Sequence, residues 1–395
     1  MRKLFLIARS NMRKAKGQTV AIVVLILIAA LMLNLWLMLA MDYKANFDRY
    51  HDKLNAEHVT VAIDDADGGV REFLDKELAD DSRITQYKLD DSLHMNVNFP
   101  YNGSEMGSWA FFLDKDTALT REVGRAELVE DGNFDSGIYL PMIYKTADIK
   151  IGKSIEITIG SHKVEYTVCG FFNSVMSGSH NCGSVEFILT EDKYAELEES
   201  EYATKATLCS VRIKNKSENL NFEAELKSTI SEQFPNVMMV SNSYDIVAQA
   251  RYVSQGICSG ILSTMAFLVL LIALVIIASN IVNYIQVNMQ NIGALKATGY
   301  TSGQLVLSLL LQFLGLTLIA ALVGAALSYA VFPAINTMMI AQTGIPYAIR
   351  FLPLPILISL VILGGTVALV VWLAARRIKK IEPIVALRSG VQTHN

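Results

Sequence analysis

Four long apolar segments dominate this sequence. They cover residues 18–41, 256–285, 305–332 and 354–373, and each reaches the roughly 20 residues that an α-helix needs to cross a bilayer. No Asp, Glu, Lys, Arg or His lies inside them. The first segment is longer than the apolar core of a signal peptide and lacks a small-residue cleavage site, so we expect it to remain as an anchor. The sequence therefore predicts four transmembrane helices.

Charged residues divide the sequence into two chemically different parts. Residues 1–41 and 256–395 hold 13 basic residues and one acidic residue, which gives a formal charge of +12. Residues 42–255 hold 21 basic and 37 acidic residues, which gives −16. This division argues against a single soluble domain and against a nucleic-acid-binding protein, whose basic residues should gather on a soluble surface. It predicts an α-helical membrane protein with a large extracytoplasmic domain inserted between transmembrane helices 1 and 2.

The positions of Lys and Arg predict the orientation of the chain, because short loops rich in these residues stay in the cytoplasm. Residues 1–17 carry six basic residues and no acidic one, and we expect them to form a basic amphipathic cytoplasmic helix. Residues 374–395 form a basic cytoplasmic tail. The connection at 286–304 is then cytoplasmic, whereas residues 42–255 and the short loop at 333–353 lie outside. Both termini are therefore predicted to be cytoplasmic.

The acidic extracytoplasmic part is predicted to fold as an α+β domain. Residues 153–159 and 163–168 are rich in β-forming side chains, and the three residues between them, Gly160-Ser161-His162, are typical of a hairpin turn. Residues 191–201 and 219–234 have the patterns of polar or amphipathic helices. The length of the segment allows one or two compact subdomains.

Two apolar stripes flank this domain, one after the first span and one before the second. Both follow the spacing i, i+4, i+7 and i+11, which is one face of an α-helix. They consist of Tyr43, Phe47, Tyr50 and Leu54, and of Ile246, Ala250, Val253 and Ile257. We expect both spans to continue outward as helices whose stripes pack together as a stalk. Two separate helices with buried faces would give the same periodicity, so the pattern leaves both interpretations open.

Patterns that suggest catalysis or ligand binding are weak. Residues 152–154 (GKS) resemble the end of a phosphate-binding loop, but Ala147 stands where its first glycine is required. Residues 65–68 (DADG) resemble the start of a calcium loop, but Lys76 replaces the glutamate at its twelfth position, which leaves adventitious calcium as the alternative. His180 and Cys182 offer two metal ligands, although their Gly- and Ser-rich surroundings favour a plain loop. We expect no catalytic, cofactor-binding or metal site, and hence no enzyme.

The cysteines and the spans exclude two further classes of protein. Three cysteines, Cys169, Cys182 and Cys209, fall in the extracytoplasmic part, and Cys258 begins the second span. This odd number predicts at least one free thiol and no disulfide framework, while a Cys169–Cys182 bridge stays open. Carriers driven by protons or ions place ionisable groups inside their spans, and this chain has none there. The sequence indicates a membrane protein that is driven from elsewhere or that only senses.

Two cytoplasmic segments carry a specific resemblance. Residues 290–305 read QNIGALKATGYTSGQL, and residues 376–390 read RRIKKIEPIVALRSG. With the four-span order, they resemble the FtsX/MacB-like permease family of ABC transporters, which has E-I-G-x-L-K-A-x-G-x-x-x-x-Q-I in this loop and P-x-x-A-L-R-x-G in the tail. The corresponding residues are Asn291, Ile292, Gly293, Ala294, Leu295, Lys296, Ala297 and Gly299, and Pro383, Ala386, Leu387, Arg388 and Gly390. Asn291 stands where the family usually has Glu, which puts in doubt a charge pair at that position.

The resemblance implies partners and a membrane. In the family this loop is a coupling helix that receives motion from a cytoplasmic ABC ATPase, and the small residues here would let it seat closely in a groove. No Walker motif occurs in the 395 residues, so ATP and Mg²⁺ are expected on the partner and no cofactor on this chain. A second permease copy or half is also expected. Small residues that allow close helix packing, within the chain or across such a dimer, are Gly256, Gly260, Gly364 and Gly365.

The function implied by the resemblance is that of a permease subunit in a bacterial plasma membrane. Such a subunit converts ATP hydrolysis by its partner into movement of its outer domain, which is called mechanotransmission, and serves the export or extraction of peptides, antibiotics or lipoproteins. The acidic domain weakly favours a cationic peptide or a metal ion as ligand. The alternative is a membrane-anchored sensor, or a regulator of a cell-wall hydrolase, without transport. A pure sensor would need neither the loop nor the tail motif.

Overall fold

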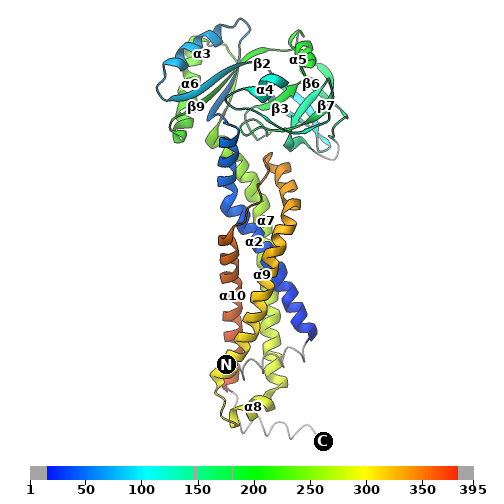
Figure 1. Cartoon of the computed structure of the whole chain (residues 1–395), viewed down its shortest axis with the longest axis vertical. Coiled ribbons are helices and arrows are strands. Elements are labelled where there is room, and N and C mark those ends of the chain that lie inside the picture. Colours follow the sequence, from blue (N-terminus) through cyan, green and yellow to red (C-terminus); the bar gives the residue numbers. More distant parts are fainter. Residues whose placement is uncertain (1–15, 146–148, 180, 381–395) are drawn as a thin grey trace. The chain divides into compact units, whose positions relative to one another are not determined.

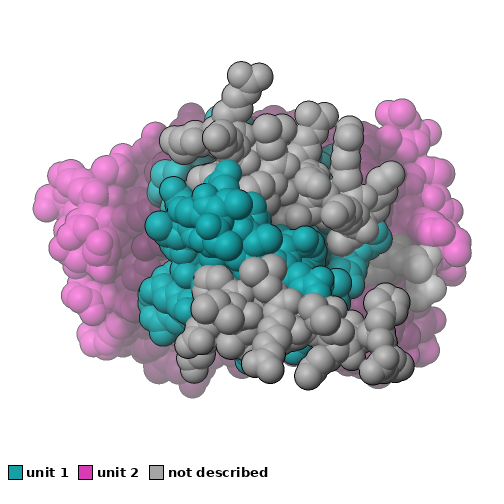
Figure 2. Space-filling view, turned by 90° about the horizontal axis from the view of Figure 1, so that it is seen from below, with its two compact units in different colours: residues 1–41, 258–333, 349–395 teal, residues 42–257, 334–348 magenta. Residues whose placement is uncertain are grey.

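The computed structural model describes residues 16–145, 149–179 and 181–380 (Figure 1). The chain forms two compact units, which Figure 2 colours teal and magenta. Unit 1 consists of residues up to 41, 258–333 and residues from 349 onward, and unit 2 consists of residues 42–257 and 334–348.

Among the described residues, four helices are long and apolar enough to cross a membrane. They are α2 (Lys16–Lys53), α7 (Tyr244–Val287), α9 (Ser302–Thr343) and α10 (Pro353–Ala375). The described part of unit 1 also contains two short elements, α8 (Met289–Ala297) and the 3₁₀-helix η3 (Arg376–Lys380). The four predicted membrane helices are therefore present.

Direct contact between α2 and α9 holds one part of unit 1 together. The side chain of Asn34 donates a hydrogen bond of 2.7 Å to the hydroxyl of Ser328. A Cβ atom added to Gly324 would lie 2.5 Å from the carbonyl oxygen of Leu27, so only glycine lets the two helices approach this closely. The packing glycine that the structure uses here is thus Gly324, which the sequence did not single out. A Cβ at Gly256, Gly260, Gly364 or Gly365 would meet no described atom within 4 Å, so these glycines make no close packing within the chain.

Unit 2 is built on one mixed sheet. Its ten described strands follow the order β10-β1-β9-β2-β3-β8-β5-β7-β4, and β6 pairs with β2 and β7. The pairs β3–β8 and β5–β7 are parallel and the other pairs antiparallel. The strands are β1 (Val59–Asp64), β2 (Ile84–Tyr101), β3 (Ser104–Asp114), β4 (Glu127–Asp131), β5 (Ile138–Pro141), β6 (Ser154–Ile159), β7 (His162–Asn173), β8 (Val185–Leu189), β9 (Lys205–Ile213) and β10 (Met239–Ser243).

Helices cover different regions of this sheet. Figure 1 shows α3 (Gly69–Asp80) and α6 (Asn219–Gln233) beside β9, and α4 (Lys115–Thr120) and α5 (Glu191–Glu198) near β3 and β6. Leu74 of α3 and Phe222 of α6 are buried with Val61 of β1, and alternate residues of the same strands face a second cluster. The α+β fold is confirmed, as are the two predicted helices and the β6–β7 hairpin, which pairs Ile159 with His162.

The ends of three long helices belong to unit 2. These are the last turns of α2, the first turns of α7 and the last turns of α9. The sequence predicted a span at 305–332 and a loop from 333, but α9 continues through Pro333 to Thr343. Met339 and Thr343 in this extension are 1% and 0% exposed, so burial within unit 2 stabilises a helix that hydropathy alone could not reveal.

Candidate functional site

A buried arginine lies where the three helix ends meet in unit 2. Along α7, Tyr244, Val247, Arg251 and Gln255 are buried on one face. The guanidinium of Arg251 is 0% exposed and donates hydrogen bonds to the carbonyl oxygens of Thr343, of Ser174 at 3.2 Å and of Val175 at 2.6 Å. Its partners are thus backbone carbonyls from the end of α9 and from the loop after β7. This cation holds three segments that lie far apart in the sequence.

The segment after α9 is fixed on the same face. Asn46 of α2 donates to the carbonyl of Pro346 at 3.0 Å and accepts from the backbone N–H of Ala348 at 3.2 Å. The hydroxyl of Tyr347 donates to Asp42 at 3.0 Å. Gly344 has φ +69°, and a Cβ there would lie 2.6 Å from the carbonyl oxygen of Gly178. Residues 344–348 of the connection between α9 and α10 are therefore part of unit 2 and not a free loop.

The two predicted stalk stripes differ in how far they are buried. Tyr43, Phe47 and Leu54 are buried and Tyr50 is half-buried, and Phe47 and Leu54 pack in one cluster with Tyr244 and Val247 of α7. The second stripe needs correction. Ile246, Val253 and Ile257 are more than half exposed and Ala250 is partly exposed, because α7 turns its Arg251 face toward α2. The buried face contains an arginine and a glutamine, so a search for apolar periodicity missed it.

Two stacked histidines lie where α2 leads into β1. The rings of His51 and His58 are parallel, with centroids 5.2 Å apart, and Tyr244 meets both edge-on. The Nε2 atom of His51 lies 2.9 Å from the carbonyl oxygen of Glu57, and the Nδ1 atom of His58 accepts from the backbone N–H of Ile213 at 3.0 Å. Burial lowers the pKa of His51 to about 4 and that of His58 to about 3. Both rings are therefore neutral at neutral pH.

A cluster of buried charges lies inside unit 2. The guanidinium of Arg121 lies 3.3 Å from Glu186 and 4.0 Å from Asp90, and all three side chains are buried. Glu57 is buried nearby, and burial raises the pKa of all three carboxyl groups while Arg121 opposes the rise. Sequence reasoning missed this cluster because its members come from four separate segments of the chain.

The predicted coupling loop folds as α8 and the turn that follows it. Ile292 and Gly293 are buried, Leu295 and Lys296 are half-buried, and Gly299 ends the segment with φ +97°. The ammonium of Lys296 donates to the carbonyl oxygen of Ile378 at 2.7 Å, which ties α8 to η3. The solvent-exposed face of this segment therefore includes Asn291, Ala294, Ala297 and Thr298. Ile292 packs into the core of unit 1 and anchors α8 there.

Several predicted residues lie outside the described part of the chain. They are the basic residues of the N-terminal tail up to Lys14, the metal-ligand candidate His180 and the C-terminal motif Pro383, Ala386, Leu387, Arg388 and Gly390.

The weak motifs have structural roles in the described residues. Asp65 accepts hydrogen bonds from the backbone N–H groups of Val70 and Arg71, so it caps α3, and from Thr207. Gly152 has φ +79° in the turn before β6. All four cysteines are free, which excludes the Cys169–Cys182 bridge. No group of three or more metal-ligating side chains occurs in the part of the chain that the structure describes.

Comparisons with known proteins show a family likeness in the C-terminal part of the chain. Residues 263–383 match the FtsX-like permease C-terminal family. No curated protein matches the sequence. Among solved structures, the extracellular domain of the noncanonic ABC-type transporter YknZ from Gram-positive bacteria matches 41% of this chain and 87% of its own length, with 11% identity and a TM-score of 0.21. The family match contains α8, α9 and α10, so this C-terminal part of the chain is similar to FtsX-like permeases.

Proposed function

We propose that this chain is the transmembrane permease subunit of an ABC transporter. In this proposal a separate cytoplasmic ATPase hydrolyses ATP, and the chain converts that reaction into movement of its outer domain. Both termini and α8 face the cytoplasm of a bacterial cell, and residues 42–255 lie outside. The family assignment and the four apolar helices support this proposal.

The single observation that carries the proposal is the burial of Arg251 among carbonyls of two other segments. An arginine that lost these partners while it stayed buried would be strongly unfavourable. The start of α7, the end of α9 and the loop after β7 should therefore move as one body. α2 and α7 are each described without a break, so a displacement along either helix would reach this body.

The exposed face of α8 is the proposed contact for the ATPase. Ala294 and Ala297 are small and exposed on this face, so another helix or groove can approach closely. The hydrogen bond from Lys296 to Ile378 would pass a push on α8 to the end of α10. Asn291 lies on the same face and offers an amide where a charge pair was in doubt.

Two further partners belong to this proposal. A second permease copy, or a second permease half, would complete the transporter, and the open surface at Gly256, Gly260, Gly364 and Gly365 has room for it. The substrate class proposed is a peptide, antibiotic or lipoprotein, and the formal charge of −16 in residues 42–255 favours a cationic peptide.

Co-purification with an ATPase tests the proposal. The chain carrying Ala294→Arg would be purified from membranes of its own cells, and proteins that carry a Walker motif would be quantified by mass spectrometry. We expect Ala294→Arg to lower the recovered ATPase at least tenfold, because a long charged side chain would block the contact. The matched control is Ala195→Arg, which places the same side chain at an exposed position of α5. Equal recovery from both variants would contradict the proposal, and a chain without any ATPase partner would favour the sensor.

A further inference from the structure

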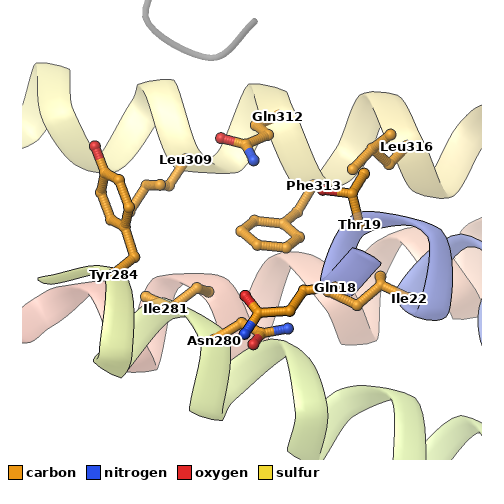
Figure 3. A pocket seen from close by; sticks show the side chains of 10 residues that line it. All are labelled: Gln18, Thr19, Ile22, Asn280, Ile281, Tyr284, Leu309, Gln312, Phe313 and Leu316. Atoms are coloured by element: carbon orange, nitrogen blue, oxygen red, sulfur yellow. The ribbon is translucent and has the colours of Figure 1, made fainter. Parts of the chain in front are cut away.

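A small cavity that is partly open to the surface lies in unit 1, between α2, α7 and α9 (Figure 3). Its volume is about 60 Å³. Besides apolar side chains it is lined by the polar groups of Gln18, Thr19, Asn280, Tyr284 and Gln312. Figure 3 shows Gln312 on α9 and Asn280 on α7 on opposite sides of this space. Polar side chains therefore gather around a void in an otherwise apolar bundle.

Two buried amide atoms at this cavity have no hydrogen-bond partner among the described residues. They are the Nδ2 atom of Asn280, which is a donor, and the Oε1 atom of Gln312, which is an acceptor. Leaving such atoms unpaired in an apolar interior is costly, so native proteins give them a partner, often ordered water. The two atoms thus point to an occupant that can accept and donate.

The chemistry of the lining restricts the occupant. None of the described residues that line the cavity is Asp, Glu, Lys, Arg or His, so an ion would have no countercharge among them. An apolar ligand would leave both amide atoms unpaired. One water needs about 10–15 Å³ of such space and two to four polar partners, so a cavity of about 60 Å³ has room for a few waters.

We infer that this cavity is an internal water site in which a few ordered water molecules bridge Asn280 and Gln312. The contact of α2 with α9 at Asn34 and Ser328 is a direct hydrogen bond, so the two regions of the bundle differ. At the water site, α7 and α9 can shift by exchanging bonds to water, whereas at Gly324 α9 packs directly against the backbone of α2. The inference does not depend on the proposed ATPase partner.

Reactivity of introduced thiols tests the inference. Leu309 lines the cavity and is 4% exposed, whereas Val371 of α10 is 0% exposed and does not line it. Leu309→Cys and Val371→Cys would be treated, in the full chain in lipid vesicles, with methyl methanethiosulfonate, a small uncharged reagent. Labelling would be read at each peptide by mass spectrometry. Only a thiolate reacts, and it forms where water reaches the sulfur. We expect the thiol of the Leu309→Cys variant to react at least tenfold faster than that of Val371→Cys, and equally slow reaction at both sites would overturn the inference.

A second set of variants distinguishes bound water from loose packing of the helices. Asn280→Leu together with Gln312→Leu, added to Leu309→Cys, removes both amides, and we expect the labelling rate to fall to that of Val371→Cys. Thr317→Val is the control, because Thr317 is buried on α9, bonds to the carbonyl of Phe313 and does not line the cavity. It should leave the rate unchanged. An unchanged rate after loss of both amides, or an equal fall with Thr317→Val, would overturn the inference. If Leu309→Cys does not fold, Leu316→Cys provides the same test.

Discussion

The guanidinium of Arg251 donates a hydrogen bond to the backbone carbonyl oxygen of Thr343, 92 residues further along the chain. Arg251 lies in the first turns of α7, and Thr343 is the last residue of α9. The carbonyl groups at a helix C-terminus lack partners within the helix and carry a partial negative charge, so a cation satisfies them well. The same guanidinium bonds to Ser174 and Val175, so one side chain fixes the end of one helix against another helix and a loop.

Replacing Arg251 with methionine should destabilise unit 2 by about 3 kcal/mol or more, because hydrogen bonds from a charged donor contribute roughly 1.5–3 kcal/mol each and the carbonyls stay buried. Methionine keeps the apolar stem but provides no donor. The stability of the Arg251→Lys variant should lie between that of the unchanged chain and that of Arg251→Met, since an ammonium cannot reach all three carbonyls at once. The free energy of unfolding of the full chain in detergent, measured by denaturant titration, tests this prediction.

The control for this substitution is Gln249→Met, at an exposed position of the same helix. Its effect should stay within about 0.5 kcal/mol, as is usual for surface substitutions. A similar loss of unfolding free energy in both variants would mean that Arg251 has no special role where α7, the end of α9 and the loop after β7 meet.

Gly344→Ala should destabilise the chain more than the same substitution at an unhindered glycine. Gly344 has φ +69°, and a Cβ there would lie 2.6 Å from the carbonyl oxygen of Gly178. Gly103 has φ +76° and open space around it. Gly103→Ala should therefore show only the conformational cost of about 1–2 kcal/mol, and Gly344→Ala that cost plus the clash. Thermal unfolding of the two variants measures the difference, and equal midpoints would show that the segment after α9 is not held against the loop at Gly178.

Particular residues show what could be predicted from the sequence. The membrane helices and the β6–β7 hairpin follow from hydropathy and from local β-forming residues, because both signals lie within one continuous segment. The extension of α9 to Thr343 was not predictable in this way. It depends on burial of Met339 and Thr343 within unit 2, and that burial comes from distant parts of the chain.

The hydrogen bonds of Arg251 could not be predicted from the sequence for a related reason. A pattern search treats arginine as a solvent-facing residue and Ile246 as a buried one, yet Arg251 is 0% and Ile246 51% exposed. The partners of Arg251 are backbone carbonyls, which every residue has, so no sequence pattern marks them. Ile292 in the predicted coupling loop packs into unit 1, and its partners there also come from distant segments.

Arg121→Met should be strongly destabilising. Arg121 neutralises a cluster that contains the buried carboxyl groups of Glu57, Asp90 and Glu186. Removing one partner from a buried ion pair typically costs about 3–5 kcal/mol, because the remaining charge is left uncompensated. The loss should be smaller in acid. The folded-state pKa of each carboxyl group is raised, so the stability that the protonated groups contribute is present at low pH and is lost as pH rises through the folded-state pKa.

Denaturant unfolding of the Arg121→Met variant at pH 5 and pH 7 measures both effects. Arg83→Met is the control, since Arg83 pairs with Asp81 and Glu225 at the surface, where ion pairs contribute about 0–1 kcal/mol. A variant whose stability did not improve in acid would show that the carboxyl groups are not electrostatically coupled to Arg121.

His51 should cause a decline in the stability of unit 2 as pH falls below 6.5, opposite in sign to the effect of the buried carboxyl groups. Burial lowers the folded-state pKa of His51 from 6.5 to about 4, so between these values the unfolded chain binds a proton that the folded chain does not. Each pH unit in this window costs about 1.4 kcal/mol for one such histidine, and the loss stops below the folded-state pKa. His51→Gln should therefore flatten the decline of unfolding free energy between pH 6.5 and pH 4. The exposed His162, stacked on Tyr202, is the control, and His162→Gln should leave the decline unchanged. If His51→Gln kept the full slope, the ring of His51 would have to be accessible to protons in the folded chain.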